Sequence, residues 1–204
     1  IDITQKKELH SKTAMLYKFQ GDYVANKDSL TDPKVVESYY RALEFAKKSN
    51  TKEDQIEFLI KIADLHSFSG NYKESIKIRE DAIHLSEKLK SERMEDYLVM
   101  LKKPFNSLVT IFSELAEDHF KNQNIEMARK YNQLSIDEVN NPEFSEFYKN
   151  QFYTKWNVEK EYHILEGRLH LLEGNQELAK KSFSEAFNVD AKSAIVDKFS
   201  DTEK

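Results

Sequence analysis

The chain has 204 residues, and its 36 acidic side chains outnumber its 31 Lys and Arg side chains, for a formal net charge of −5. That balance argues against direct binding of nucleic acid, which needs concentrated basic surface. The absence of cysteine excludes disulfides, thiolate zinc sites and cysteine nucleophiles, and no apolar run reaches the roughly 18 residues of a membrane span.

The first quarter of the chain predicts one helix pair. Residues 1–13 are polar and lead into a helix that runs to about residue 26, with an apolar stripe at three- and four-residue spacing. Asp32 is a suitable N-cap and Pro33 suits the first helical position, so a second helix should start there. Residues 35–46 carry its apolar face, and residues 49–51 break it.

A second pair is predicted over residues 51–90. Thr51 followed by two acidic residues marks a helix start, because carboxylates favour the positive end of the helix dipole. Gly70 is the residue expected where the chain takes a positive φ at a helix end. The helix after that turn carries an apolar stripe to Leu89, and we expect it to run past Lys90.

Residues 91–108 are the least regular part, and Pro104 should end or kink any helix there. Helical stripes resume over 108–120 and 127–136, joined by a turn at 122–124 that contains no glycine.

The last third of the chain has few helix breakers. Residues 142–173 predict either one helix of about 30 residues or two helices broken near Asn150. Residues 161–191 predict two antiparallel helices joined at Glu173, Gly174 and Asn175. Residues 192–204 are expected to form a short capping helix that frays into a charged tail.

The four predicted helix pairs can be aligned on one another. Small residues occupy the first matched position, and three further positions follow on the second helix of each pair. The aligned sets are Gly21, Ala63, Ala116 and Gly167; Val35, Ser75, Ala128 and Ala179; Tyr39, Arg79, Asn132 and Phe183; and Ala42, Ala82, Ser135 and Ala186. We call these the template positions. Gly70 and Gly174 also coincide, at the turn inside a pair.

This pattern resembles the tetratricopeptide repeat (TPR), a helical repeat of two antiparallel helices. The units are approximately 14–49, 56–90, 109–141 and 160–191. They are about 40 to 53 residues apart, wider than the usual 34, which resembles the regulator and motor-adaptor branches of that family. The resemblance implies an all-α right-handed superhelix with longer than usual helices, formed as a single domain over 1–204. We expect the chain to be a fragment of a larger protein.

The resemblance also implies a concave groove lined by the first helix of each pair, where a peptide or a partner helix could bind. The implied groove positions are Lys18, Asp22, Ala25, Asn26, Glu57, Ile60, Asp64, Phe68, Thr110, Ser113, Glu117, Lys121, Glu161, Ile164, Arg168 and Leu172. Asp22 and Thr110 stand where the family's carboxylate clamp has Asn and Lys, so chaperone-tail binding is not expected.

Two further features can be interpreted either as functional or as ordinary packing. His66, His119 and His170 share one repeat position, which would suit a pH-sensitive ladder, but packing in a slot that usually holds tyrosine is favoured. The aromatic residues of 144–156 could form an exposed partner-binding patch, although core packing is the commoner outcome. The residues of that patch would be Phe147, Tyr148, Phe152 and Trp156.

No catalytic set, metal site or cofactor is predicted, since the sequence has no glycine-rich phosphate loop and its carboxylates are spread over helix faces. We expect a non-catalytic module that binds a protein or peptide, acting as scaffold or adaptor within a regulatory protein. The alternative is a signal-sensing region that relays ligand binding to an output domain outside this chain. Self-association through the aromatic segment is a third possibility.

Overall fold

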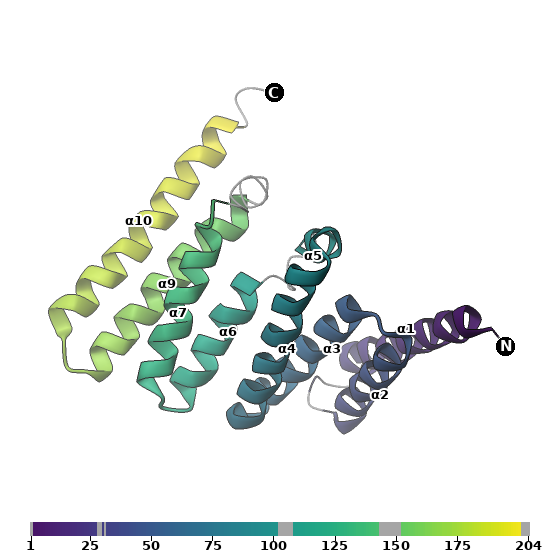
Figure 1. Cartoon of the computed structure of the whole chain (residues 1–204). Coiled ribbons are helices and arrows are strands. Elements are labelled where there is room, and N and C mark those ends of the chain that lie inside the picture. The colour runs from purple at the N-terminus through teal and green to yellow at the C-terminus, as the bar shows by residue number, and fades with distance from the viewer. Residues whose placement is uncertain (1, 28–29, 31, 102–107, 143–151, 201–204) are drawn as a thin grey trace. The chain divides into compact units, whose positions relative to one another are not determined.

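A computed structural model describes residues 2–27, 30, 32–101, 108–142 and 152–200 (Figure 1). These residues form nine helices and no strand, as the all-α prediction requires. The chain divides into two compact units, Ile1–Ser107 and Leu108–Lys204. Two of the four predicted helix pairs fall in each unit. One domain over the whole chain stays a prediction.

Unit 1 contains α1 (Ile3–Lys27), α2 (Pro33–Ser49), α3 (Lys52–Phe68), α4 (Tyr72–Glu92) and α5 (Met94–Leu101). Helices α1 and α2 form one antiparallel pair and α3 and α4 a second, and α2 packs against α3 (Figure 1). The short α5 lies against α4. Stacking of one pair on the next is what a helical repeat needs, because a single pair cannot bury both of its apolar faces.

Most of the helix ends in unit 1 follow the local chemistry of the sequence. The Asp32 carboxylate accepts a hydrogen bond from the backbone N–H of Lys34 at 2.8 Å, and Pro33 begins α2. Gly70 has φ +74° in the turn between α3 and α4. Thr51 precedes α3 as predicted, although its side chain makes no capping bond.

The extent of α1 differs from the prediction. It begins at Ile3, so the polar segment expected to lead into a helix is itself helical. Residues 3–13 are mostly exposed, and a helix that buries little shows little apolar periodicity. Helix α4 extends two residues beyond Lys90 and ends at Glu92. Pro104 lies outside the described residues.

Unit 2 contains α6 (Leu108–Lys121), α7 (Ile125–Val139), α9 (Phe152–Leu172) and α10 (Gln176–Ser200). Helices α6 and α7 are one antiparallel pair and α9 and α10 the other, and α9 packs on both helices of the preceding pair. Helix α10 continues to Ser200, so the expected short capping helix is instead the last part of this element. The predicted start or break between Pro142 and Asn150 falls largely on residues 143–151, outside the described residues.

The template positions explain how each pair closes. All of them are buried except Phe183, which is 37% exposed. Gly21 faces the ring of Tyr39, and Gly167 faces the ring of Phe183. Ser75 donates a hydrogen bond of 2.9 Å from its hydroxyl to the carbonyl of Ala63. Small residues on the first helix thus meet the second helix at close range, and the helix pairing predicted from sequence is confirmed.

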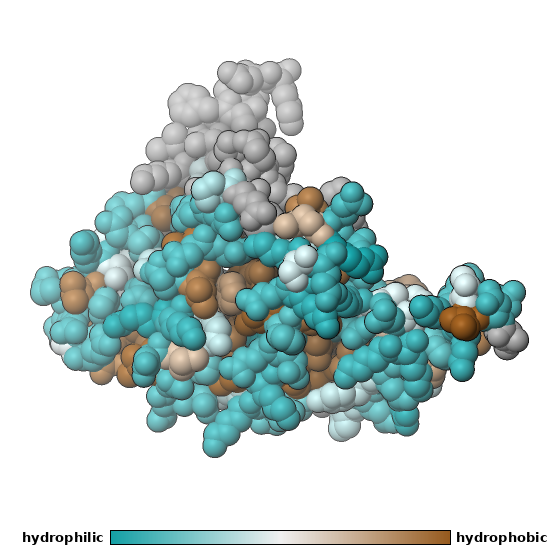
Figure 2. Space-filling view, viewed as in Figure 1, coloured by the Kyte–Doolittle hydropathy of each residue, from teal (hydrophilic) through white to brown (hydrophobic). Residues whose placement is uncertain are grey.

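The apolar core of each unit lies between its helices. In unit 2, Ala116, Ala128, Leu165 and Leu169 form one buried cluster. Figure 2 shows mostly hydrophilic side chains on the visible face, with apolar side chains recessed between them. Within the described segments, no helix has both the length and the apolar composition needed to cross a bilayer.

Candidate functional site

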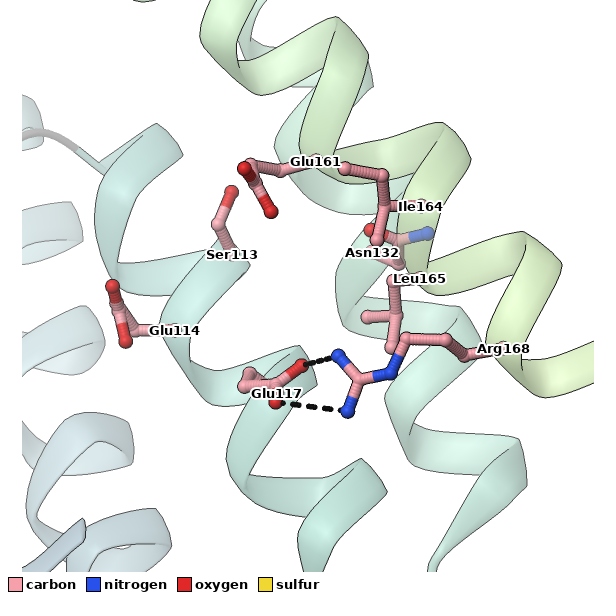
Figure 3. Close-up of a pocket in the computed structure, with 8 residues that line it drawn as sticks. All are labelled: Ser113, Glu114, Glu117, Asn132, Glu161, Ile164, Leu165 and Arg168. Atoms are coloured by element: carbon pink, nitrogen blue, oxygen red, sulfur yellow. Dashed lines mark hydrogen bonds and ion pairs between the residues drawn. The ribbon is translucent and has the colours of Figure 1, made fainter. Parts of the chain in front are cut away.

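Each unit has a pocket bordered by the first helices of its two pairs. The unit 1 pocket has a volume of about 360 Å³ and the unit 2 pocket about 240 Å³. The unit 1 pocket is lined by Asp22, Ala25, Asn26, Leu30, Tyr39, Lys61, Asp64, Leu65 and Phe68. The unit 2 pocket is lined by Ser113, Glu114, Glu117, Asn132, Glu161, Ile164, Leu165 and Arg168 (Figure 3).

Many of the predicted groove residues line these pockets. The unit 1 pocket brings together Asp22, Asn26, Asp64 and Phe68. The unit 2 pocket brings together Ser113, Glu117, Glu161 and Arg168. Ala25 and Ile164, which the same resemblance implied, are also lining residues. Equivalent positions of two different pairs therefore face one space in each unit.

Lys18, Asp22 and Glu57 form an ion-pair cluster beside the unit 1 pocket. The ammonium of Lys18 lies 2.8 Å from Asp22 and 3.7 Å from Glu57, and the hydroxyl of Tyr39 donates to the other oxygen of Asp22. Burial alone would raise the pKa of Asp22, but the hydrogen bonds from Lys18 and Tyr39 outweigh it and lower that pKa. Burial would likewise lower the pKa of Lys18, and its two carboxylate partners raise it. Asp22 is therefore held as a carboxylate.

Asp64 occupies the same repeat position as Asp22 and is also held from the second helix of its pair. The guanidinium of Arg79 lies 2.8 Å from the Asp64 carboxylate. The Arg79 side chain is 1% exposed and that of Asp64 is 33% exposed. Tyr39 and Arg79 are themselves equivalent template positions. In both pairs of unit 1, then, a buried second-helix residue anchors a carboxylate at the groove.

The equivalent position of the third pair is Glu117, which is held differently. Its carboxylate accepts two hydrogen bonds from Arg168 of the fourth pair, at 2.8 and 3.2 Å (Figure 3). Arg168 also lies over the ring of Phe120, 4.0 Å from its centroid, and Lys121 approaches Glu117 at 3.5 Å. This bidentate pair fastens α6 to α9.

Asn132 is a lining residue that the sequence argument did not select. It is 3% exposed, and its amide nitrogen donates to the carbonyl of Tyr162 at 3.1 Å and to Glu166 at 3.0 Å. Both partners are acceptors, so the nitrogen must face them and the amide oxygen must point the other way. The sequence signal that could have identified Asn132 is its alignment with Tyr39 and Arg79, the two residues that hold the groove carboxylates in unit 1.

The remaining predicted positions stay predictions. Leu172 is 58% exposed and lines neither of these two pockets. Phe147 and Tyr148 lie outside the described residues, as does the side chain of Phe152. Trp156 is half-buried on α9.

The three equivalent histidines share a backbone role. Each carbonyl accepts the N–H of the residue five positions later, at 2.8 or 2.9 Å, which is the bond that closes a helix C-terminus. Their side chains differ. His66 contacts the hydroxyl of Tyr40 at 3.2 Å, His170 contacts Glu173 at 3.3 Å, and His119 is buried. These separate environments favour packing over a common ladder. Among the described residues no group of three His, Asp or Glu side chains is placed to hold a metal ion.

Among known proteins, only solved structures are similar to this chain. No protein-family model matches the chain, and no curated protein matches it. Two similar crystal structures contain nearly identical TPR-like repeats assigned to a kinesin light chain of Podosopora anserina. Each shares 12% identity with this chain. The first, a point variant, covers 93% of this chain and 95% of its own with a TM-score of 0.44, and the second covers 94% and 98% with a TM-score of 0.42.

A third similar structure is a double mutant of MamA RS-1. It shares 16% identity with this chain, covers 89% of this chain and 96% of its own, and has a TM-score of 0.32.

Proposed function

We propose that this chain is a non-catalytic binding module that holds a peptide segment of a partner protein along the first helices of its helix pairs, as a scaffold or adaptor. The observation that carries the proposal is the clustering of equivalent first-helix positions around one pocket in each unit. In a helical repeat such positions form the extended binding surface.

The polar groups at the two pockets suit holding a ligand rather than transforming one. Asp22, Asp64 and Glu117 each make a close ion pair with a basic side chain. The pKa of Asp22 is lowered, whereas a general acid needs a carboxyl whose pKa is raised toward neutrality. These pairs fix the shape and charge of the surface.

The unit 1 pocket also offers apolar area to a ligand. Phe68 is 71% exposed and Leu30 is 50% exposed, and both line the pocket. Large apolar side chains left exposed at a pocket are typical of binding hot spots, because a ligand that covers them removes their surface from water. We expect Phe68 to contribute strongly to affinity while contributing little to folding.

Selection of peptides from a random library displayed on phage, using the full chain as bait, tests the proposal. Affinities of the enriched peptides are then measured by fluorescence anisotropy for the wild type and for Phe68→Ala. The matched control is Phe187→Ala on α10, since Phe187 is 73% exposed and lines neither pocket. We expect Phe68→Ala to weaken binding about tenfold and Phe187→Ala to leave it unchanged. Failure to enrich any peptide, or equal effects of the two variants, would contradict the proposal.

A further inference from the structure

The unit 2 pocket offers a ligand hydrogen-bond acceptors and almost no charged donor. The amide oxygen of Asn132 lies at the pocket in a side chain that is 3% exposed. It accepts no hydrogen bond from any described residue, since the contacts of this side chain are those of its nitrogen. This oxygen is not among the side-chain atoms that are both fully buried and unpaired, so the pocket opens onto it and a donor group of a ligand can reach it.

Arg168 is the one cation among the described residues that line the pocket, and it is already engaged. Both terminal nitrogens of Arg168 donate to Glu117, and the guanidinium lies over the ring of Phe120, 4.0 Å from its centroid. A planar guanidinium held at both terminal nitrogens by one carboxylate has most of its charge compensated there. Binding of an anionic group would require that pair to break.

The remaining charged side chains of the lining are acidic. Glu161 lies on α9, is exposed, and makes no ion pair with any residue that the structure describes. Glu114 is a further carboxylate of the lining. Figure 3 shows Glu161 and Ser113 on one side of the pocket and the Glu117–Arg168 pair on the other.

Apolar side chains complete the pocket. Leu165 is 5% exposed and Ile164 is half-buried, and both line it on the α9 side. A long side chain with methylene groups and a charged head can lie against such a wall while its head reaches polar partners. Lysine and arginine are the side chains with that construction.

We propose that the unit 2 pocket receives the Lys or Arg side chain of a bound peptide. The methylene stem lies on Ile164 and Leu165, Glu161 compensates the positive charge, and an N–H group donates to the oxygen of Asn132. This inference rests on the proposed function and adds the chemical class of the partner segment. It makes a basic residue, rather than a carboxylate or a phosphate, the feature recognised by unit 2.

The test uses charge reversal in the full chain with peptides enriched by the display selection described above. Glu161→Lys reverses the charge at the pocket, and Glu161→Gln removes it with little change in shape. Glu185→Lys is the matched control, because Glu185 is an exposed residue of unit 2 on α10 and does not line the pocket. Each peptide is also made with its basic residues replaced singly by norleucine and by glutamate.

We expect Glu161→Lys to weaken binding of a basic peptide about tenfold and Glu161→Gln to weaken it about threefold, whereas Glu185→Lys leaves it within about twofold of wild type. The norleucine peptide should bind the wild type weakly and lose its sensitivity to residue 161. The glutamate peptide should bind Glu161→Lys better than it binds the wild type. Affinity of the basic peptide should fall as salt is raised.

The outcomes separate this inference from the proposed function. The basic-side-chain site is contradicted if the peptides bind with Phe68-dependent affinity but contain no basic residue. It is also contradicted if Glu161→Lys affects their binding no more than Glu185→Lys does. In both cases the peptide-binding function still stands. A selection that enriches no peptide overturns both.

Discussion

Gly167 of α9 lies directly against the ring of Phe183 of α10. A β-carbon placed on Gly167 would be 2.6 Å from Cε1 of that ring, closer than two nonbonded carbon atoms can approach. At the equivalent position of the first pair, a β-carbon on Gly21 would be 3.2 Å from the ring of Tyr39. With the Phe183 ring in this position, α9 and α10 therefore pack at a distance that requires glycine at residue 167.

Gly167→Ala should destabilise unit 2 by about 1 to 3 kcal/mol, because the added methyl group forces the helices or the ring apart. Gly21→Ala should cost less, since its neighbours need to move only a few tenths of an ångström. Urea unfolding followed by fluorescence of Trp156, the single tryptophan, measures the effect in unit 2. Combining Gly167→Ala with Phe183→Leu should recover part of the loss, and strict additivity would show that the ring is not the obstacle.

Gln123→Gly should stabilise unit 2. Gln123 has φ +61° in the turn between α6 and α7, where Gly70 and Gly174 stand in the second and fourth pairs. A left-handed conformation costs a residue with a β-carbon about 1 to 2 kcal/mol, partly offset by the greater flexibility of an unfolded glycine. We expect a net gain of about 1 kcal/mol in the free energy of unfolding. Gly174→Ala is the converse variant and should lose a similar amount.

Asp64→Ala should destabilise unit 1 by about 2 kcal/mol or more, because it removes a carboxylate from a guanidinium that is 1% exposed. Asp64→Ala combined with Arg79→Met should be less damaging than the sum of the two single changes, since the double variant leaves no buried charge. Unfolding followed by far-UV circular dichroism gives the three values. Additive losses would mean that the two side chains stabilise the unit independently.

Unit 2 should lose stability as the pH falls below about 6.5, the ordinary pKa of histidine. His119 is 5% exposed and stacks on Tyr131 with ring centroids 5.4 Å apart, and neither ring nitrogen has a hydrogen-bond partner among the described residues. Burial lowers the pKa of His119 against the opposing effect of Asp118, and Lys130 lowers it further. As the pH falls, the unfolded chain therefore binds the proton first. The contribution of neutral His119 to the free energy of unfolding is complete above the pKa of the unfolded chain, and it decreases until the pH passes the lower pKa of the folded protein.

His119→Phe supplies the control for this pH dependence, since it keeps an aromatic ring against Tyr131 and removes the titrating group. Thermal unfolding at pH 7.5 and pH 5.5, followed by Trp156 fluorescence, should show a larger loss for the wild type than for His119→Phe. An equal loss in both proteins would assign the pH dependence to other groups.

The sequence predicted the helix pairs because their closing contacts are local and chemically specific. Gly70 and Gly174 mark positive-φ turns, and Asp32 with Pro33 marks the start of α2. The full length of α1 was missed because residues 3–13 are mostly exposed and lack apolar periodicity. The positive φ of Gln123 was missed because a glutamine carries no signal for that conformation.

The candidate site was predictable only in part. Repeat alignment placed Asp64, Glu117 and Arg168 at equivalent positions of their helices, and in the structure all three line the pockets, since equivalent positions of a repeat face the same side. It did not predict that Glu117 pairs with Arg168, because they are 51 residues apart and their contact depends on how two pairs stack. Asn132 was missed because it lies on α7, the second helix of its pair, whereas the predicted groove positions were all on first helices.

Hydrogen exchange of the full chain, with and without a peptide enriched by display, tests most directly whether the first helices bind the partner. The account predicts slower exchange on binding along α1 and α3 of unit 1 and along α6 and α9 of unit 2, with α4 and α10 unchanged. Protection confined to α4 and α10, with the first helices of both units unaffected, would contradict it.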